Sequence, residues 1–445
     1  MKKRLNLSKY SVLLSLVALP LISNTSFAFT INDAIEDAII HNPEFRQEVK
    51  TFRARESEVS SAEGRYLPVI SLNAGIGYEE VDRVGLNNEG DGLTRREASI
   101  KLTQNLFEGF GTQNEVYRQK YRLDSASFRA HSAANDVALD MATAYVNLLR
   151  EKDILQLAKD NLDTHNTLLE QIDKRYTAGI GNQVEVDQAN ARLALAQSSL
   201  GSAENNYYDA FAKFQRVLGR KPTNTLIKPQ FSFPIPETLE EATKEALINH
   251  PTLKSANADV ADARAQHDAS GRNYYPTVDL EIEKTFDENI NGVEGKNEIL
   301  QAMIRLRYNL YNGGRDSDDL NRTISEYHRA SEIRNNSRRQ VIENLRFAWN
   351  ARDFITKQME FQDKHIKLTY ETLAGYRKQF NLGRRSLLDL LNTENEHVTA
   401  TRTLINSKAD LLNAQYRILA ATGHLIDELK IQYTFIAAED EYQSE

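Results

Sequence analysis

Residues 112–178 read TQNEVYRQKYRLDSASFRAHSAANDVALDMATAYVNLLREKDILQLAKDNLDTHNTLLEQIDKRYTA. This stretch contains no glycine or proline in 67 positions, and a second stretch, 315–374, contains none in 60. Because an α-helix rises 1.5 Å per residue, helices of this length span about 90 to 100 Å, far more than an ordinary globular helix. The sequence therefore predicts two very long helices.

Each long helix is followed by a glycine and then by a return segment with a heptad pattern. After Gly179 the apolar positions alternate large and small side chains at Val186, Ala189, Leu193, Ala196, Leu200, Ala203, Tyr207, Ala210, Phe214 and Val217. After Gly383 the pattern is looser, at Leu390, Thr393, His397, Ala400, Leu404, Ser407, Leu411, Ala414, Ile418 and Ala421. The outgoing helices are expected to supply the facing seam with Leu155, Leu162, Leu169 and Tyr176, and with Met359, Ile366, Leu373 and Phe380. The pattern indicates two long antiparallel helical hairpins that turn at Gly179 and Gly383.

The two hairpins belong to one duplicated module. Tyr66-Leu67-Pro68 recurs 208 positions later as Tyr274-Tyr275-Pro276, and Leu106-Phe107-Glu108-Gly109 recurs 204 positions later as Leu310-Tyr311-Asn312-Gly313. A period near 200 is too long for a solenoid repeat and indicates one duplication.

The duplication divides the chain into a series of expected segments. We expect a first repeat at 29–221, a proline-rich linker at 222–237, a second repeat at 238–425 and a C-terminal segment at 426–445. Each repeat is expected to begin with a short helix and then to carry one β-hairpin, at 66–107 and 275–311, before its long helices.

The first 28 residues have the features of a removable signal peptide. Four basic residues precede an apolar run at 10–22, and Ser26-Phe27-Ala28 gives the small-x-small pattern of a signal-peptidase site. Taking those four from 55 leaves 51 basic against 63 acidic residues, a net charge of −12. This balance argues against nucleic-acid binding, because that affinity comes from basic side chains that neutralise phosphates.

The sequence contains no cysteine, which excludes disulfides, thiol chemistry and a thioether lipid anchor. After the signal peptide no apolar run reaches the ~18 residues of a transmembrane helix, so any membrane segment is expected to be a β-strand.

Two segments in each repeat alternate apolar and polar residues, as amphipathic strands do. The apolar positions are Ile70, Leu72, Ala74, Ile76 and Tyr78; Ala98, Ile100 and Leu102; Val278, Leu280 and Ile282; and Leu300, Ala302, Ile304 and Leu306. Alternation alone also fits an ordinary sheet over a core. However, aromatic residues bracket segments of ~11 residues, as they do in membrane strands with aromatic girdles. Four strands cannot close a barrel and open edges are not tolerated in lipid, so membrane strands would require several chains to share one barrel.

At these motifs the chain resembles the TolC family of outer-membrane efflux and type I secretion channel proteins. The resemblance rests on Tyr66-Leu67-Pro68, Leu106-Phe107-Glu108-Gly109, the Arg175-Tyr176-x-x-Gly179 turn, and Phe380-Asn381-Leu382-Gly383 followed by Leu388-Asp389-Leu390-Leu391, and it runs from residue 42 to Gly423. It implies a mainly α protein with β-strands that forms a homotrimer, with a 12-stranded barrel in the lipid of the cell outer membrane and an α-helical tunnel across the periplasm. It also implies an equatorial belt built from the chain ends and the linker.

The resemblance further implies a passive exit duct for type I protein secretion or multidrug efflux. Its partners would be a periplasmic adaptor protein and an inner-membrane ABC transporter or proton-driven pump. The adaptor would dock at the hairpin turns, around Gly179, Gly181, Gly383 and Arg384.

The turns are also expected to form the periplasmic entrance. Asn182-x-x-Glu185 and Ser386-x-x-Asp389 read as capping boxes, which by themselves explain the two acids. The resemblance adds a gate in which acids near Asp389 ring the narrowest point and a residue like Arg385 helps to hold neighbouring helices together. Glu185 occupies the equivalent place in the first repeat, and Tyr176, Phe380 and Arg175 are expected to help hold the turns together. Asn392 stands where a second acid is familiar in the family, and Phe380 stands where a hydrogen-bonding tyrosine is familiar.

Other motifs do not point to an enzyme or a cofactor. No Gly-x-Ser-x-Gly, His-Glu-x-x-His or Walker A pattern is present, and His165 and His397 fall on seam positions where polar packing is expected. Asp287-x-Asn289-x-Asn291-Gly292, with Glu298 after it, matches the spacing of a calcium-binding loop, but the same residues suit a solvated hairpin turn.

Two classes of function therefore remain. The first is an outer-membrane export channel. The alternative is a periplasmic coiled-coil scaffold or adaptor of the cell envelope, in which the strands would form a small soluble domain.

Overall fold

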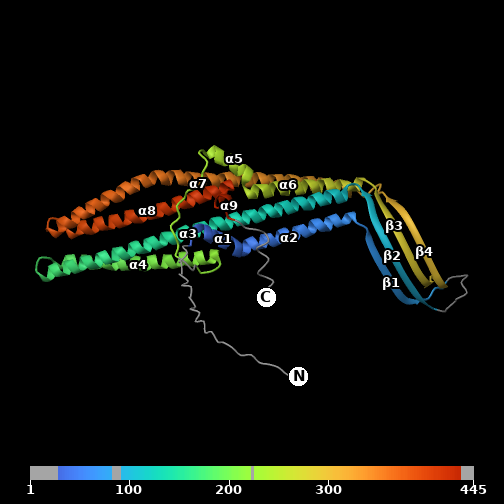
Figure 1. Ribbon diagram of the computed structural model, residues 1–445, viewed down its shortest axis with the longest axis horizontal. Coiled ribbons are helices and arrows are strands. Elements are labelled where there is room, and N and C mark those ends of the chain that lie inside the picture. Colours follow the sequence, from blue (N-terminus) through green and yellow to red (C-terminus); the bar gives the residue numbers. More distant parts are fainter. Residues whose placement is uncertain (1–28, 83–91, 222–224, 432–445) are drawn as a thin grey trace, which may run out of the picture.

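The computed structural model describes residues 29–82, 92–221 and 225–431. The expected signal peptide at 1–28, the linker residues 222–224 and the C-terminal segment from residue 432 lie outside the described residues. The molecule is long and narrow, with a β-sheet at one end and the turns of two helical hairpins at the other (Figure 1).

Both repeats have the same order of elements. The first contains α1 (Ile31–His41), α2 (Pro43–Glu63), β1 (Val69–Glu79), β2 (Leu93–Glu108), α3 (Gly111–Thr177) and α4 (Gln183–Leu218). The second contains α5 (Leu239–Asn249), α6 (Pro251–Ser270), β3 (Thr277–Ile290), β4 (Val293–Arg307), α7 (Arg315–Asn381) and α8 (Leu387–Thr422), and α9 (Leu425–Glu428) follows it. The prediction of duplicated long antiparallel hairpins is confirmed.

Each repeat begins with two helices, so the expectation of one short helix was wrong. Proline occupies the first position of both α2 and α6, and a side chain caps each of these helices. Asn42 Oδ1 accepts a hydrogen bond from Glu44 N at 2.8 Å, and His250 Nδ1 accepts one from Thr252 N at 3.3 Å. A proline at the first helical position together with a side-chain cap starts a new helix and breaks the preceding one.

The helices lie side by side in one layer. At the turn end α3 packs on α4 and on α8, and α8 packs on α7, so the order across the layer is α4–α3–α8–α7. Towards the sheet α2 and α6 replace the returning helices, because α3 packs on α2 and α6, and α6 packs on α7. In the part of the chain that the structure describes, no helix is both long and apolar enough to cross a membrane.

The seam predicted for α4 is confirmed, and the one predicted for the outgoing helix α3 is confirmed in part, because Leu155 and Leu169 are half-buried against core clusters whereas other positions of α3 are buried more deeply. Buried residues of α3 near the turn are Ile154, Ala158, His165, Leu168 and Ile172, while Tyr176 is 40% exposed. The physical reason is that α3 has two neighbours, so its buried stripe faces the space between α4 and α8. In α7 the predicted positions hold, since Leu373 and Phe380 are buried.

The largest core lies midway along the helices. Tyr145, which is fully buried, donates a hydrogen bond from its hydroxyl to Phe29 O at 2.7 Å and accepts one from Ile227 N at 2.9 Å. Phe29 and Leu226 also form a parallel bridge, so the start of the described chain and the linker meet on α3. The equivalent aromatic residue in the second repeat, Trp349, packs in a separate core with α5 and α8.

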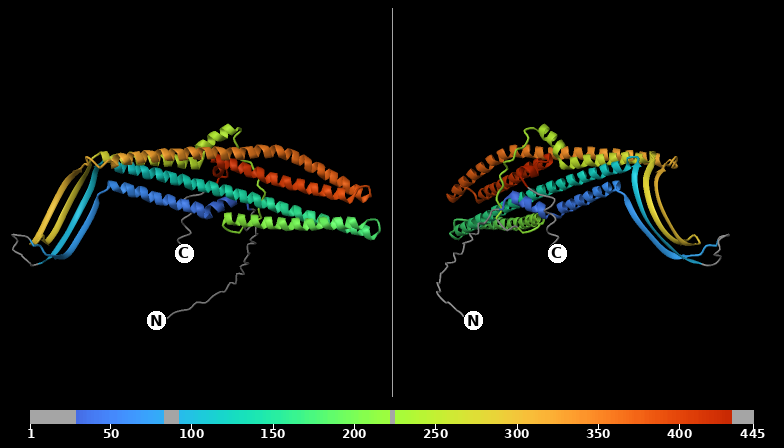
Figure 2. Two further views of the ribbon diagram at one scale, coloured as in Figure 1. Left: turned by 180° about the vertical axis from the view of Figure 1, so that it is seen from behind. Right: turned by 45° about the vertical axis from the view of Figure 1, so that its right-hand side comes forward.

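The four strands form one antiparallel sheet in the order β1-β2-β3-β4. One-turn 3₁₀-helices, Gly64–Tyr66 and Gly271–Tyr274, lead into the two segments predicted as hairpins. In both views of Figure 2 the sheet extends beyond the helix ends, and no helix lies over either of its faces. The sheet therefore has no covering layer within the described part of one chain.

The cap of α6 predicts a pH effect on stability. Burial lowers the pKa of His250 from 6.5 to about 4, so as pH falls the unfolded chain binds this proton before the folded chain does. The stability that neutral His250 contributes is complete above about pH 6.5 and is lost as pH falls to about 4. His250→Asn, which copies the cap at Asn42, should flatten this part of the pH profile in thermal unfolding of the detergent-purified protein. Identical losses in both proteins would contradict this role of His250.

Candidate gate at the turns of the helical hairpins

The two hairpin turns have the same backbone geometry. Gly179 has φ +74° and Gly383 has φ +71°, a left-handed conformation that favours glycine. Ile180 N donates to Arg175 O, and Arg384 N donates to Gln379 O, both at 2.9 Å, as in the C-terminal motif that closes many helices. Chain reversal is thus fixed locally in each repeat.

Both returning helices begin with a side-chain cap. Asn182 Oδ1 accepts from Glu185 N at 3.0 Å, and Ser386 Oγ accepts from Asp389 N at 3.2 Å. The reciprocal bond of a capping box is present at Thr30 and Asp33 of α1 but not at either turn, so the prediction of two complete capping boxes was wrong. The carboxylates of Glu185 and Asp389 are therefore not engaged in capping, and both remain at the turn end.

A hydrophobic cluster just inside the turns joins the two hairpins. It combines Leu168 and Ile172 of α3 and Val186 and Ala189 of α4 with Leu373, Phe380, Leu387, Leu390 and Leu391 of the second hairpin. Phe380 is 4% exposed, whereas its counterpart in the first repeat, Tyr176, is 40% exposed. Of these two predicted gate residues, only Phe380 belongs to the contact between the hairpins.

Arg175 crosses from the first hairpin to the second. Its Nη1 donates a hydrogen bond to Phe380 O at 3.3 Å, and its Cζ lies 4.8 Å from the centroid of the Phe380 ring. A guanidinium over an aromatic face is attracted by the ring quadrupole, so Arg175 and Phe380 hold the turns together.

Arg385 acts within its own hairpin. Its Cζ lies 3.9 Å from the centroid of the Tyr376 ring, and its Nε lies 3.6 Å from Asp389 Oδ2, too far for a hydrogen bond. Within one chain the predicted latch residue Arg385 therefore does not bridge the hairpins, and it partly offsets the charge of Asp389.

Two polar contacts between or near the hairpins were missed by sequence reasoning. Arg192 Nη2 donates to Asn392 Oδ1 at 3.2 Å, which links α4 to α8. Arg377 Nη2 pairs at 2.7 Å with Glu394 Oε2, and Glu394 is buried. No motif could have revealed either pair, because the partners come from separate helices or helical turns with no characteristic spacing.

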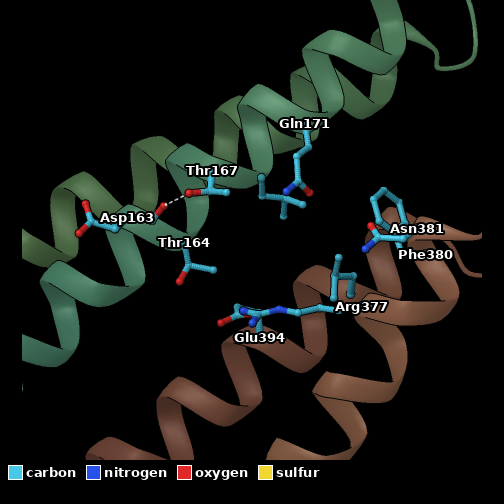
Figure 3. A pocket seen from close by; sticks show the side chains of 10 residues that line it. Asp163, Thr164, Thr167, Gln171, Arg377, Phe380, Asn381 and Glu394 are labelled. Carbon is cyan, nitrogen blue, oxygen red and sulfur yellow. Dashed lines mark hydrogen bonds and ion pairs between the residues drawn. The ribbon is translucent and has the colours of Figure 1, made fainter.

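The Arg377–Glu394 pair lies in a polar cavity of about 360 Å³ between the hairpins (Figure 3). Asp163, Thr164, Thr167 and Gln171 of α3 line one side, and Phe380 and Asn381 of α7 lie opposite them. Near this cavity His165 is buried, and burial lowers its pKa below the usual range. The hairpins are thus joined by apolar packing at the turns, and a group of polar side chains lines the cavity beside that contact.

The segment that matches the spacing of a calcium-binding loop is a tight hairpin turn, which is the alternative that the sequence also offered. Asn291 and Gly292, with φ of +56° and +74°, connect the paired residues Ile290 and Val293. Asn289 Oδ1 accepts from Gly295 N at 2.9 Å, so this side chain is used within the turn.

The four proposed calcium ligands also do not converge. Asp287 pairs with Asn297, while Glu298 pairs with Phe286, one position along the strand and hence on the other face of the sheet. Glu298 Oε2 instead pairs with Lys284 Nζ at 2.9 Å. Among the described residues no group of three His, Asp or Glu side chains is placed to bind a metal ion.

One face of the sheet at the opposite end of the molecule is a continuous apolar band. The strand register aligns Ile70 with Leu102, Leu102 with Ile282, and Ile282 with Ala302, so the apolar residues of all four strands share that face. These side chains are open to the surroundings, and Leu72 is 72% exposed. The other face is polar and carries a network in which Lys101, Arg305 and Arg307 surround Glu281.

The family is established by sequence comparison. The profile of the family described as outer membrane efflux protein matches residues 34–220 and 242–424, which together include most of the chain and both repeats. The chain belongs to this family. It is therefore an outer-membrane protein, and its function is that of an exit duct for efflux or secretion, as expected from the resemblance to the TolC family.

Relatives of this outer membrane efflux protein match over nearly their whole length. It is 24% identical over 420 residues to the outer membrane efflux protein BepC of Brucella suis, covering 93% of this chain and 90% of BepC. It is 22% identical over 426 residues to outer membrane protein TolC of Escherichia coli, covering 92% and 83%. The alkaline protease secretion protein AprF of Pseudomonas aeruginosa is 22% identical over 431 residues, covering 93% and 88%.

A solved structure supports the fold. The outer membrane protein VceC of Vibrio cholerae superposes with a TM-score of 0.77 at 16% sequence identity, covering 88% of this chain and 96% of VceC.

The asymmetry between the turns predicts unequal effects of two matched substitutions. Phe380→Ala should lower the local free energy of opening at the turns by about 3–5 kcal/mol, the usual cost of removing a buried phenylalanine. Tyr176→Ala, at the equivalent position of the first repeat, should cost less than about 1 kcal/mol because the side chain is exposed. Hydrogen exchange of the amides in 373–391 measures both, and equal effects would contradict the assignment of Phe380 to the contact between hairpins.

Proposed function

We propose that three copies of this chain close one 12-stranded barrel in the outer membrane and continue it as a helical tunnel into the periplasm. The proposal rests on the sheet, which exposes an apolar face and has an unpaired edge on each of its two outer strands within the described residues. Within the described residues β1 and β4 each pair on one side only. A strand edge in hydrocarbon needs a hydrogen-bonding partner, which a second copy of the same sheet supplies.

The duct so formed acts passively and is not an enzyme. The hairpin turns around Gly179, Gly181, Gly383 and Arg384 point away from the membrane and receive a periplasmic adaptor, which connects them to an inner-membrane ABC transporter or proton-driven pump. Relatives named for efflux and for alkaline protease secretion support both kinds of system.

The alternative of a soluble periplasmic scaffold is disfavoured by the sheet. A soluble domain would cover the apolar positions of its strands, whereas Ile76, Leu300 and Ile304 are open on one face.

The turns act as the gate of the duct. Glu185 and Asp389 place six carboxylates at the entrance of a trimer, and repulsion between them favours separation of the helices. The packing of Phe380 and its contact with Arg175 oppose that separation. Adaptor binding that favours the separated turns would then open the entrance by differential affinity for the two states.

Conductance in planar bilayers tests the gate. Arg175→Ala should destabilise the closed turns by about 1–2 kcal/mol and raise the open fraction roughly 5- to 30-fold. Arg385→Ala should have a smaller effect, because Arg385 contacts only its own hairpin. A larger effect of Arg385→Ala would indicate instead that Arg385 stabilises the closed turns through a contact with a neighbouring chain.

Ion selectivity tests the carboxylates in the same bilayer assay. Asp389→Ala should lower the preference for cations, whereas Asn392→Ala, an uncharged position one turn later, should leave it unchanged. Unchanged selectivity in a well-folded Asp389→Ala trimer would leave Asp389 without a role in the gate.

Topology can be tested by surface labelling, since the chain has no cysteine. Asn291→Cys, at the β3–β4 turn, should react with an impermeant thiol reagent on intact cells. Ile180→Cys, at the exposed turn between α3 and α4, should react only after the cells are disrupted. The reverse pattern would invert the proposed orientation.

A further inference from the structure

The apolar band of the sheet ends in a group of charged residues on the side of the β3–β4 turn. Arg96 follows Ile100 and Ala98 on β2 at every second position, so it lies on the apolar face. The strand register places Arg96 opposite Glu288 of β3, and Glu288 opposite Lys296 of β4. We call this group the charged patch, and it consists of Arg96, Lys284, Glu288, Lys296 and Glu298.

The charged patch follows the edge of the apolar band, which runs obliquely across the sheet. Ile76 of β1 lies in the same row of register partners as Arg96 and Lys296. On β1 the apolar positions of this face continue to Tyr78, whereas on β4 they end at Leu300. A band that steps along the strands in this way fits strands that are tilted against a membrane, as they are in barrels.

The cations of the charged patch have hydrogen-bond donors to spare. Arg96 is 61% exposed and donates from Nη1 to Glu288 Oε2 at 3.0 Å, which uses only part of the five N–H donors of a guanidinium. Lys296 is exposed and has no ion pair among the described residues. Three cations minus two carboxylates leave the charged patch a net charge of +1, so it favours an anion.

The position of the charged patch on the lipid-facing side restricts what that anion is. Charged side chains on this side of a barrel are costly in hydrocarbon and are tolerated near the interface, where the lipid headgroups lie. Lys284 Nζ extends towards the β3–β4 turn, where it pairs with Glu298 Oε2 at 2.9 Å and lies 5.1 Å from the centroid of the Phe286 ring. Long basic side chains reach the interface in this way. In the proposed orientation the charged patch therefore lies among the headgroups of the outer leaflet.

The apolar residues next to the charged patch suit the acyl chains of a lipid. Ala98, two positions from Arg96 on β2, lies opposite Ala74 of β1. The neighbouring side chains Leu72 and Ile76 are large, and both are more than 70% exposed. Small residues between large ones let an acyl chain approach the strands closely, which adds van der Waals contact.

We propose that the charged patch binds the phosphate groups of a phosphorylated lipid of the outer leaflet. Arg96 and Lys296 donate hydrogen bonds to the phosphate oxygens, the guanidinium as a planar fork and the ammonium as a point charge. Glu288 holds Arg96, and Glu298 holds Lys284, in position beside the phosphate. The inference rests on the proposed barrel and its orientation, and it names the class of lipid that the outside of the barrel selects.

Native mass measurement of the detergent-purified trimer tests the site, with bisphosphorylated lipid A as the probe. The trimer should retain lipid A in preference to phosphatidylethanolamine, whose headgroup has no net charge. Arg96→Gln with Lys296→Gln should weaken lipid A binding by on the order of tenfold, because two charge-assisted donors to phosphate are lost. Arg96→Lys with Lys296→Arg, which keeps both charges, should largely preserve the binding.

Two controls separate this site from a general effect of charge. Lys364→Gln with Lys367→Gln removes the same charge from exposed positions of α7 and should leave lipid A binding unchanged. Inorganic phosphate at millimolar concentration should not displace lipid A, because it makes no contact with the apolar band. Displacement by inorganic phosphate would indicate a site for free anions and would overturn the lipid assignment.

The outcomes also separate this inference from the proposed function. Weaker lipid A binding in the Arg96 and Lys296 glutamine variant, but not in the Lys364 and Lys367 variant, supports the site. A trimer that conducts in planar bilayers but binds lipid A equally in both variants, or not at all, overturns the lipid site and leaves the duct intact. A protein that stays monomeric in detergent overturns both.

Discussion

Backbone hydrogen bonding in hydrocarbon is the constraint on which the rest of this structure depends. Every N–H and C=O of a strand in a membrane needs a partner from protein, because lipid tails offer none. One chain provides four strands, which is half of the smallest barrel with a filled interior. In the proposed assembly other copies of the chain supply the missing partners of the two outer strands, β1 and β4.

Duplication gives the chain two copies of each helix cap and of each central aromatic residue, but the two copies have different neighbours and have diverged in sequence. Asn42 and His250 both cap a helix that begins with proline, yet only the histidine adds a pH dependence. Tyr145 and Trp349 lie in separate cores, and only Tyr145 ties the start of the described chain to the linker. Sequence symmetry therefore sets the architecture, while the differences set what each half contributes.

The turns of the hairpins show the same divergence between the two repeats. Phe380 is buried between the hairpins and receives Arg175, whereas Tyr176 faces outwards and Arg385 stacks on Tyr376 in its own hairpin. Near the turns the second hairpin is held to the first by one small cluster and a few polar contacts, whereas midway along the helices α8 shares the largest core with α3 and α4. The contact near the turns can be broken locally without unfolding the long seams, because those seams lie within each hairpin.

The sequence by itself determined the elements whose pattern is local. Runs without glycine or proline fixed the long helices, the 3,4 spacing fixed the seam of α4, and strict alternation fixed which face of each strand is apolar. The turn glycines and the duplicated order then placed these elements in one architecture, and they were sufficient to identify the family. Apart from the duplication, which compares positions about 200 residues apart, these signals depend on neighbours within a few positions along the chain.

Only the tertiary structure decided which of several equivalent side chains make contact. In the tertiary structure Phe380 and Arg175, and not their counterparts Tyr176 and Arg385, form the contact between the two hairpins. Arg192 and Asn392, which no sequence pattern linked, are hydrogen-bonded. It also placed Asp287 and Glu298 on opposite faces of the sheet, which favours the hairpin turn over the calcium loop that the same spacing matches. The physical reason is that spacing fixes which residues share a face of one element, whereas burial and partners depend on which other element packs against that face.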